Sequence, residues 1–232
     1  MLTEYLYKSN KPSDPKRAIL ILPEIYGLKP FAKELADRCA TELGFTGYGL
    51  DYFWALTHEV NDFDYQAGMA RGIELMNQMS GELFIALLTK VVERVKLEQP
   101  ELERLAVVGF CFGGRLAYLS GIHDTVTDII SFYGAGSTKP GFYHADSAVS
   151  ATVQVRQGMQ DLRVLGLFGS EDDSIPEEDR KTIAEQLQGA GIAVEMHEYA
   201  AGHAFFNADR TDHYVAEAAS QAWDDVKTWL ST

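Results

Sequence analysis

The sequence predicts an α/β fold, with a mostly parallel central sheet that carries helices on both faces. Three observations lead to this prediction. Short runs of continuously apolar residues recur along the chain, as in strands that are buried on both faces. Amphipathic stretches with helical spacing separate these runs, and the links between them are short. Such an alternation is typical of parallel strand–helix–strand units, and 232 residues are enough for one such domain over 1–232.

The first half of the chain starts this alternation at residues 18–25 (AILILPEI), where we expect a buried strand that ends at a turn. A helix is expected at 31–44, because Gly44 closes a stretch whose apolar side chains share one face: Phe31, Leu35, Cys39 and Leu43. The next strand is expected at 46–53. Residues 55–68 are polar and aromatic without a clear period, so we expect a connection over one end of the sheet.

The second half repeats the pattern. Strands are expected at 104–111, 128–134, 163–170 and 193–200, and helices at 82–99, from 115–121 onward, at 176–191 and at about 212–230. Pro100 ends the first of these helices, and Trp223, Val226 and Trp229 share one side of the last. One long segment, about 137–160, is rich in Gly, Ser and Ala. We expect it to be irregular, as loops that cap active sites are.

Composition and charge narrow the possible partners. The chain has 20 basic and 34 acidic residues, and its formal charge of −14 repels phosphate backbones and anionic lipids. No apolar run approaches the roughly 20 residues of a membrane span, and residues 1–17 lack the pattern of a signal peptide. Two cysteines do not make a disulfide framework. We therefore expect a cytoplasmic monomer or small homo-oligomer without nucleic-acid or membrane partners.

The motif GFCFGG (109–114) places a cysteine between a predicted strand and a predicted helix. Its glycines allow a tight turn that holds Cys111 exposed at the end of the sheet. The N–H groups and the positive dipole end of the following helix would then face the sulfur, which favours a thiolate and stabilises an oxyanion. The motif favours a nucleophile at Cys111, and the alternative is a buried thiol that packs as a small apolar group.

A thiol nucleophile needs a base, and the base needs an acid that orients it. In hydrolases with this topology the acid and then the histidine follow the nucleophile along the chain. Asp172 and Asp173 directly follow one predicted strand, and His203 follows another, so both groups lie at the edge where ligand sites gather. Of the six histidines, only His203 lies in a glycine-flanked loop at this edge. Either aspartate could orient it, and the other could cap the next helix.

Glu24 follows the first predicted strand directly, where a loop that helps to form an oxyanion hole is expected. A carboxylate at that place would repel a developing oxyanion. Two interpretations remain open at this point. Glu24 is either a solvated side chain in a turn, or a carboxylate that takes the proton of the Cys111 thiol.

Four motifs, taken together, resemble those of the dienelactone hydrolase family of α/β-hydrolases. The resemblance covers about 18–230 and keeps the family's order and spacing. The motifs are PEIYG (23–27), the G-x-C-x-G-G pattern at 109–114, GSEDDSIP (169–176) and GHAF (202–205). Four linked motifs are more specific than any one of them. The resemblance implies an α/β-hydrolase fold and a Cys-Asp-His catalytic triad.

The resemblance also implies a role for each matched residue. Cys111 would be the nucleophile and His203 the base. Asp172 would be the orienting acid, because the family pattern places Val or Ile three residues after it and Pro next, as here. Glu24 would hydrogen-bond the resting thiol and accept its proton when substrate binds. The backbone N–H groups of Ile25 and Phe112 would form the oxyanion hole.

The chain departs from the family where the substrate is bound. The family's lactone hydrolases carry an arginine four residues after the catalytic histidine, and this chain has Asn207 there. A second family arginine lies in a middle region that does not align, where Arg71 is a loose match. Aromatic side chains are candidates for an apolar pocket, although such residues are more often core: Tyr48, Tyr52, Phe53, Trp54, Tyr133 and Phe205. The resemblance to the family therefore supports the catalytic residues better than it supports the family's substrate.

The sequence thus predicts a hydrolase of carboxylic esters or lactones that needs neither a metal nor a cofactor, acting through an acyl-enzyme on Cys111. One alternative is a non-catalytic protein that binds a small molecule on a hydrolase fold. Another is a thiol redox sensor, which would need Cys39 as the resolving cysteine. Cys39 lies on the core-facing side of a predicted helix, so we do not expect it to reach Cys111.

Overall fold

The computed structural model of the chain describes residues 4–144, 146–159 and 161–232. Seven strands form one sheet in the order β1-β3-β2-β4-β5-β6-β7. Every neighbouring pair is parallel except β1 and β3. The strands are β1 (Leu6–Lys8), β2 (Asp14–Leu22), β3 (Phe45–Leu50), β4 (Arg104–Phe110), β5 (Val126–Phe132), β6 (Arg163–Gly169) and β7 (Ala193–Tyr199).

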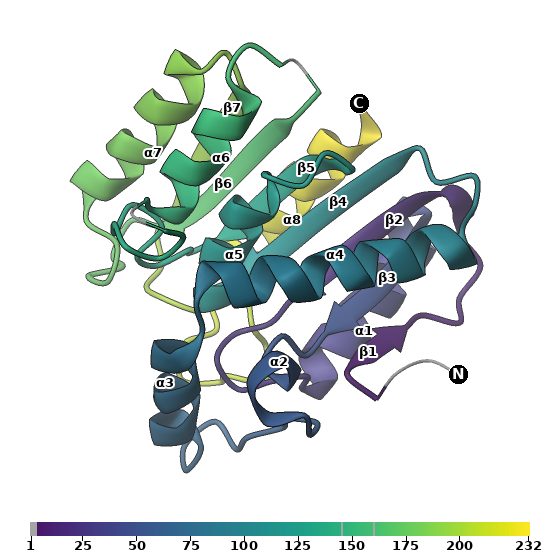
Figure 1. Cartoon of the computed structure of the whole chain (residues 1–232). Helices are drawn as coiled ribbons and strands as arrows, with labels where there is room; N and C mark the ends of the chain where they lie inside the picture. Colours follow the sequence, from purple (N-terminus) through teal and green to yellow (C-terminus); the bar gives the residue numbers. More distant parts are fainter. Residues whose placement is uncertain (1–3, 145, 160) are drawn as a thin grey trace.

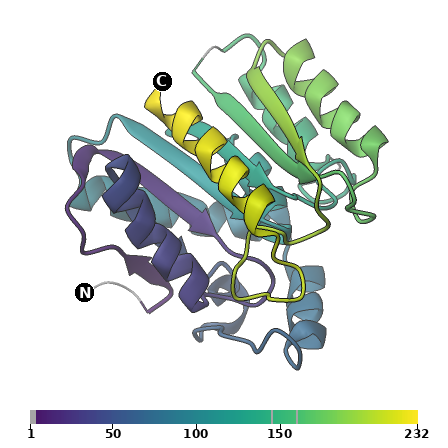
Figure 2. The same ribbon diagram turned by 180° about the vertical axis from the view of Figure 1, so that it is seen from behind.

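Helices cover both faces of this sheet. They are α1 (Pro30–Arg38), α2 (Trp54–Thr57), α3 (Met69–Gln78), α4 (Gly81–Glu98), α5 (Phe112–Ser120), α6 (Ala148–Arg156), α7 (Glu177–Gly189) and α8 (Ala216–Ser231), with a π-helical turn η1 (Cys39–Leu43) after α1. Helices α4 to α7 lie on the face seen in Figure 1, and α1 and α8 lie on the other face, seen in Figure 2. The predicted parallel sheet with helices on both faces is confirmed.

The strand order places the candidate site at a change of direction in the sheet. From β2 the chain passes through α1 to β3 on one side, and later returns to β4 on the other side of β2. Parallel sheets bind ligands at the carboxyl ends of the strands beside such a point. The loops that follow β2, β4, β6 and β7 all leave the sheet at this edge. They carry Glu24, Cys111, Asp172 and His203, respectively.

The prediction of an irregular segment at 137–160 was wrong for its second half, which forms α6; residues 145 and 160 lie outside the described residues. The helix is capped by Ser147, whose hydroxyl accepts from the N–H of Ser150 at 3.1 Å. Its inner face buries two polar side chains, Thr152 and Arg156, beside the apolar Ala148, Val149 and Ala151. Thr152 donates to the carbonyl of Tyr118, and Arg156 donates to that of Gly121 at 2.7 Å. Buried polar residues hide the apolar period on which the prediction depended.

Smaller differences concern the ends of elements. Strand β2 ends at Leu22, so Glu24 and Ile25 lie in the loop and not in the strand. Helix α5 begins at Phe112, directly after Cys111. The helix expected at 31–44 is divided into α1 and η1, and it ends at Gly44 in the left-handed region as expected. Strand β1 and helix α3 were not predicted. Residues 1–3 of the predicted domain lie outside the described residues.

Candidate active site

The turn that carries Cys111 is strained and depends on its glycines. Cys111 has φ 55° and ψ −118°, in a region that residues with a side chain rarely adopt. A Cβ on Gly109 would lie 2.0 Å from the carbonyl oxygen of Gly113, and a Cβ on Gly113 would lie 2.2 Å from that of Leu22. Both contacts are with backbone that cannot turn away. The glycines thus allow the end of β4, the start of α5 and the end of β2 to pack closely around the half-buried thiol.

Phe112 and Ile25, whose N–H groups are expected to form an oxyanion hole, lie at the same edge of the sheet as Cys111. Phe112 is the first residue of α5, so its N–H has no acceptor within the helix. Ile25 lies in the loop that follows β2 and is 9% exposed. Helix α3 packs directly on this loop, since a Cβ on Gly72 would lie 2.4 Å from the carbonyl oxygen of Ile25.

His203 and Asp172 form a close pair at the same edge. The Nδ1 atom of His203 lies 2.6 Å from Oδ2 of Asp172, and the other carboxylate oxygen accepts from the N–H of Ser174 at 2.9 Å. Burial raises the pKa of Asp172, but His203 and Ser174 more than offset it, so this pKa is lowered overall. Burial also lowers the pKa of His203, while the charges and hydrogen bonds of Cys111 and Asp172 raise it to about 10. An imidazolium is therefore stabilised between a sulfur and a carboxylate.

The structure distinguishes the two adjacent aspartates. Asp172 is 4% exposed and contacts His203, whereas the neighbouring Asp173 is exposed.

The other cysteine is also placed clearly. Cys39 is fully buried where α1 meets η1, and burial raises the pKa of its thiol well above the usual range. A buried thiol of this kind is unreactive, so nothing here favours Cys39 as a resolving cysteine.

Glu24 is buried in the site with only 3% of its surface exposed. Its Oε1 accepts from the hydroxyl of Tyr133 at 3.3 Å, and its Oε2 accepts from Nδ2 of Asn207 at 3.4 Å and from Nη1 of Arg210 at 3.5 Å. Burial raises the pKa of this carboxyl group, and Arg210 and then His203 oppose that rise. The hydrogen bonds of the Glu24 carboxylate do not include the expected bond with the thiol of Cys111.

Arg210 is the residue at this site that sequence reasoning missed. Its side chain is 10% exposed and its guanidinium lies 5.5 Å from the ring centre of Tyr26. Asn207, 1% exposed, bonds both Glu24 and the hydroxyl of Tyr65. The available signal was an arginine seven residues after His203 instead of four.

Of the remaining candidates, Tyr133 and Tyr52 contact the site, and the hydroxyl of Tyr52 donates to the carbonyl oxygen of Glu24 at 3.0 Å. The ring of Tyr133 is 5.1 Å from that of His203. Phe205 is fully buried in the core. Arg71 is exposed on α3 and pairs with Glu74 of the same helix at 2.7 Å. The structure therefore brings together Cys111, His203, Asp172, Glu24, Tyr133 and Asn207, but it does not add Arg71 or Phe205 to them.

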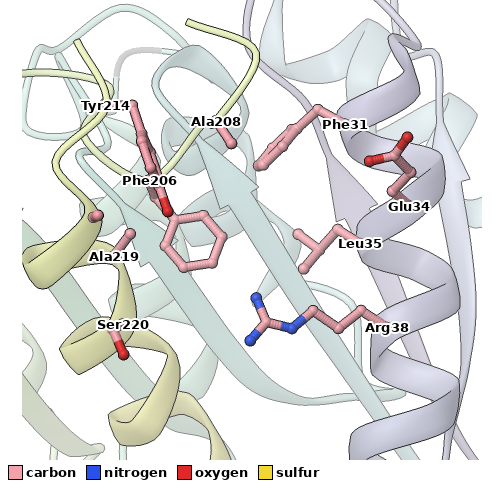
Figure 3. Close-up of a pocket in the computed structure, with 10 residues that line it drawn as sticks. Phe31, Glu34, Leu35, Arg38, Phe206, Ala208, Tyr214, Ala219 and Ser220 are labelled. Atoms are coloured by element: carbon pink, nitrogen blue, oxygen red, sulfur yellow. The ribbon is translucent and has the colours of Figure 1, made fainter. Parts of the chain in front are cut away.

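A pocket of about 350 Å³ lies between α1 and α8, on the far side of the His203 loop. Phe31 and Leu35 of α1 face Phe206 across it, and Arg38 extends into the same gap (Figure 3). None of the four catalytic candidates lines this pocket. Among the described residues there is also no cluster of His, Cys, Asp or Glu that could hold a metal ion, and no helix is long and apolar enough to cross a membrane.

The chain is similar to known proteins over nearly its whole length. The model of the dienelactone hydrolase family matches residues 2–232. A relative from Escherichia coli, named "Putative carboxymethylenebutenolidase", is 28% identical over 225 residues, which are 95% of this chain and 79% of the relative. A relative from Synechocystis sp. with the same name is 29% identical over 216 residues, or 92% and 85% of the two chains.

Solved structures show the same fold. A crystal structure named "Putative Dienelactone Hydrolase" from Klebsiella pneumoniae matches with a TM-score of 0.79 and 23% identity, covering 98% of this chain and 92% of that one. A crystal structure described as an alpha/beta hydrolase enzyme from a deep-sea metagenome library matches with a TM-score of 0.61 and 17% identity, covering 99% and 93% of the two chains. The α/β-hydrolase fold implied by the four motifs is confirmed.

Proposed function

Because the chain belongs to the dienelactone hydrolase family and is a hydrolase of that family, we propose that it cleaves carboxylic esters or lactones with Cys111 as the nucleophile. One observation carries this proposal. Cys111, His203 and Asp172 come from three separate loops; His203 lies 2.6 Å from Asp172, and Cys111 raises the pKa of His203, which supports the roles of nucleophile, base and orienting acid. We do not propose a non-catalytic binding protein, because no contact in the site favours it.

The first chemical step is attack by the Cys111 thiolate on the acyl carbon. The carbonyl π electrons move to oxygen, where the N–H groups of Phe112 and Ile25 stabilise the negative charge. The tetrahedral intermediate then collapses, the bond to the leaving oxygen breaks, and His203 gives that oxygen its proton. A thioester joins the acyl group to Cys111. For a lactone, the released alcohol stays attached to the acyl group.

The second step returns the enzyme to its starting state. His203, oriented by Asp172, takes a proton from a water molecule, and the resulting hydroxide attacks the thioester carbon. The same N–H groups stabilise the second oxyanion. Collapse breaks the carbon–sulfur bond and releases the carboxylic acid, and the thiolate takes back the proton that Glu24 accepted from the resting thiol. No metal or cofactor enters either step.

Glu24 and Arg210 support a proposal for the substrate class. The name of these relatives, carboxymethylenebutenolidase, denotes an enzyme that hydrolyses a butenolide with a carboxymethylene group. A butenolide is a lactone. In this chain Arg210 supplies the cation that Asn207 does not. A substrate carboxylate that binds Arg210 would compete with Glu24 for the guanidinium. Glu24, whose pKa is already raised by burial, would then be released to take the thiol proton. We propose esters or lactones with a nearby carboxylate as preferred substrates.

The test is hydrolysis of a panel of aryl esters and enol lactones, with and without a carboxylate, by the wild type and by Cys111→Ala. We expect turnover by the wild type, with higher kcat/KM for the carboxylate-bearing members, and none above background by Cys111→Ala. Circular dichroism and thermal unfolding of the variant show whether its fold is intact. Full activity of a folded Cys111→Ala protein would refute the mechanism.

The expected cytoplasmic location remains a proposal that depends on the sparse cysteine content.

A further inference from the structure

Arg115 on α5 is a cation for which the proposed mechanism has no use. Its guanidinium stacks on the ring of Phe142, with Cζ 3.8 Å from the ring centre, and its Nη2 donates to the carbonyl of Lys139 at 3.4 Å. Its Nε is buried and has no acceptor among the residues that the structure describes. Burial lowers the pKa of Arg115 to about 10, and no neighbouring carboxylate opposes this change. The group is thus a partly buried charge without a counter-ion in the part of the chain that the structure describes.

A second cation lies beside the first. The position that a Cβ on Gly136 would take is 3.6 Å from Nη1 of Arg115 and 3.4 Å from Cδ of Lys139. Lys139 is exposed and has no ion pair within the described ranges 4–144, 146–159 and 161–232. Two cations with no carboxylate between them repel each other, and an anion that binds between them removes this repulsion.

The cavity beside Arg115 offers hydrogen-bond donors to an anion, and its acidic residue does not occupy Arg115. Arg115 and Phe142 line a cavity of about 340 Å³ together with residues of the α3–α4 junction. In Figure 1 this junction lies beside the start of α5. Asn77 and the hydroxyl of Ser80 line it as well, and both are able to donate hydrogen bonds. Glu82 is the one carboxylate among its lining residues. It accepts from the backbone N–H of His144 at 2.6 Å and forms no ion pair with Arg115.

Proteins seldom leave a desolvated charge uncompensated, because its removal from water is unfavourable unless a partner replaces the lost hydration. We propose that Arg115 binds the oxyanion of a small molecule, a carboxylate or a phosphate group, in the cavity between α5 and the α3–α4 junction, and that the nearby Lys139, which does not line this cavity, adds its positive charge. Nη1 of Arg115 has no acceptor among the described residues and, unlike the buried Nε, is open to an oxygen of such a group. This site is separate from Cys111 and does not depend on the proposed hydrolysis.

The first experiment is a titration of ¹⁵N-labelled protein with inorganic phosphate and, separately, with acetate, at an ionic strength held constant with chloride. The Nε–H signals of arginine side chains are followed by NMR, and Arg115→Gln identifies the signal of Arg115. We expect saturable movement of that signal with one of the two anions. In the variants, binding is followed instead by the side-chain amide signal of Asn77, which lines the cavity. Arg115→Gln should lower the affinity by about tenfold or more, as expected for loss of a charge-assisted contact. Lys139→Gln, at an exposed position, should lower it less.

The matched control is Arg94→Gln, because Arg94 lies on α4 but has its own ion pair with Glu98 at 2.6 Å. This variant should leave the affinity unchanged. If neither anion moves the Arg115 signal, or if Arg115→Gln and Lys139→Gln both bind as the wild type does, the site does not exist. Since the titration requires no turnover, its failure is distinguishable from a failure of the proposed hydrolysis.

A kinetic comparison then identifies the source of the oxyanion. Phe142 packs on Phe112, with ring centres 5.8 Å apart, so the cavity adjoins the residue expected to stabilise the reaction's oxyanion. If the oxyanion belongs to the substrate, Arg115→Gln lowers kcat/KM for an ester with an anionic tail more than for its neutral counterpart. If it belongs to a separate molecule, added phosphate changes the wild-type kcat/KM for a neutral ester, and Arg115→Gln removes that response.

Discussion

The two sides of the active site are built in different ways. On one side, Cys111, Asp172 and His203 directly follow strand ends, and their positions depend on backbone turns such as the one that Gly109 and Gly113 allow. On the other side, the Glu24 carboxylate is held by side chains of separate loops, among them that of Arg210, 186 residues away in the chain. The nucleophile side therefore has a local sequence signature. The Glu24 side exists only once the chain has folded.

This difference suggests how each side responds to change. Backbone-built groups are preorganised for one geometry, so substitutions there should reduce kcat strongly. Carboxylate–guanidinium contacts of 3.5 Å are long and exchangeable, so substitutions on the Glu24 side should change substrate preference instead.

The largest effect is expected on the nucleophile side from Asp172→Asn, with Asp173→Asn as its matched control. The first change removes the acceptor that orients His203 and should reduce kcat by about 10³- to 10⁴-fold, as in other triads. The second alters an exposed side chain and should leave kcat within about twofold. Steady-state kinetics of both variants measure the difference. Equal loss in the two variants would mean that the assignment of Asp172 is wrong.

The next largest effect concerns stability of the turn. Gly113→Ala would place a Cβ 2.2 Å from the carbonyl oxygen of Leu22, so the β2 end that leads to Glu24 must move. We expect a loss of about 3 kcal/mol or more in the free energy of unfolding, together with most of the activity. Gly189→Ala is the control, because nothing lies within 4 Å of its added Cβ. Urea unfolding should show it as stable as the wild type or more so, and a tolerated Gly113→Ala would contradict the account of the turn.

A smaller effect is expected from Arg210→Gln on the Glu24 side. For a carboxylate-bearing ester, kcat/KM should fall by about 10- to 100-fold, since one charge-assisted contact is lost. For a neutral ester of the same leaving group, the change should be several times smaller. The ratio of the two kcat/KM values is the measurement. An equal loss for both esters would indicate that Arg210 only supports the fold, and that the two sides of the site do not differ as described.

The smallest effect is a pH dependence of stability. The pKa of His203 is raised in the folded protein to about 10, above the unfolded value of about 6.5. Its contribution is therefore complete below about pH 6.5 and is lost as the pH rises toward 10. Asp172, whose pKa is lowered, contributes in the opposite range, and its share is lost as the pH falls below about 4.

Replacing Cys111 by Ala removes the largest cause of the raised pKa of His203. The free energy of unfolding of Cys111→Ala should therefore fall less steeply between about pH 6.5 and pH 10 than that of the wild type. Urea unfolding at a series of pH values measures both slopes. Identical slopes would show that the sulfur and the imidazole do not interact in the folded protein.

The features that the sequence predicted are those encoded by local patterns, as on the nucleophile side of the site. The features that it did not predict depend on contacts between distant segments, as on the Glu24 side. Apolar runs and glycine turns indicated the parallel sheet and placed Cys111, Asp172 or Asp173, and His203 at one edge. The choice between the aspartates needed either the family pattern or the 2.6 Å contact with His203. Helix α6 was not predicted, because its buried Thr152 and Arg156 are stabilised by hydrogen bonds to other segments. Arg210 was not predicted, because no local pattern links it to Glu24.

The central claim is that Cys111 forms a thioester with the acyl group. Rapid acid quenching of the wild type with a slowly hydrolysed aryl ester, followed by mass spectrometry of the intact protein and its peptides, tests this claim directly. We predict an added acyl mass on the peptide that contains Cys111, which appears before steady state, disappears on turnover and is absent in Cys111→Ala. Turnover without any adduct, or an adduct on another residue that persists in Cys111→Ala, would contradict it.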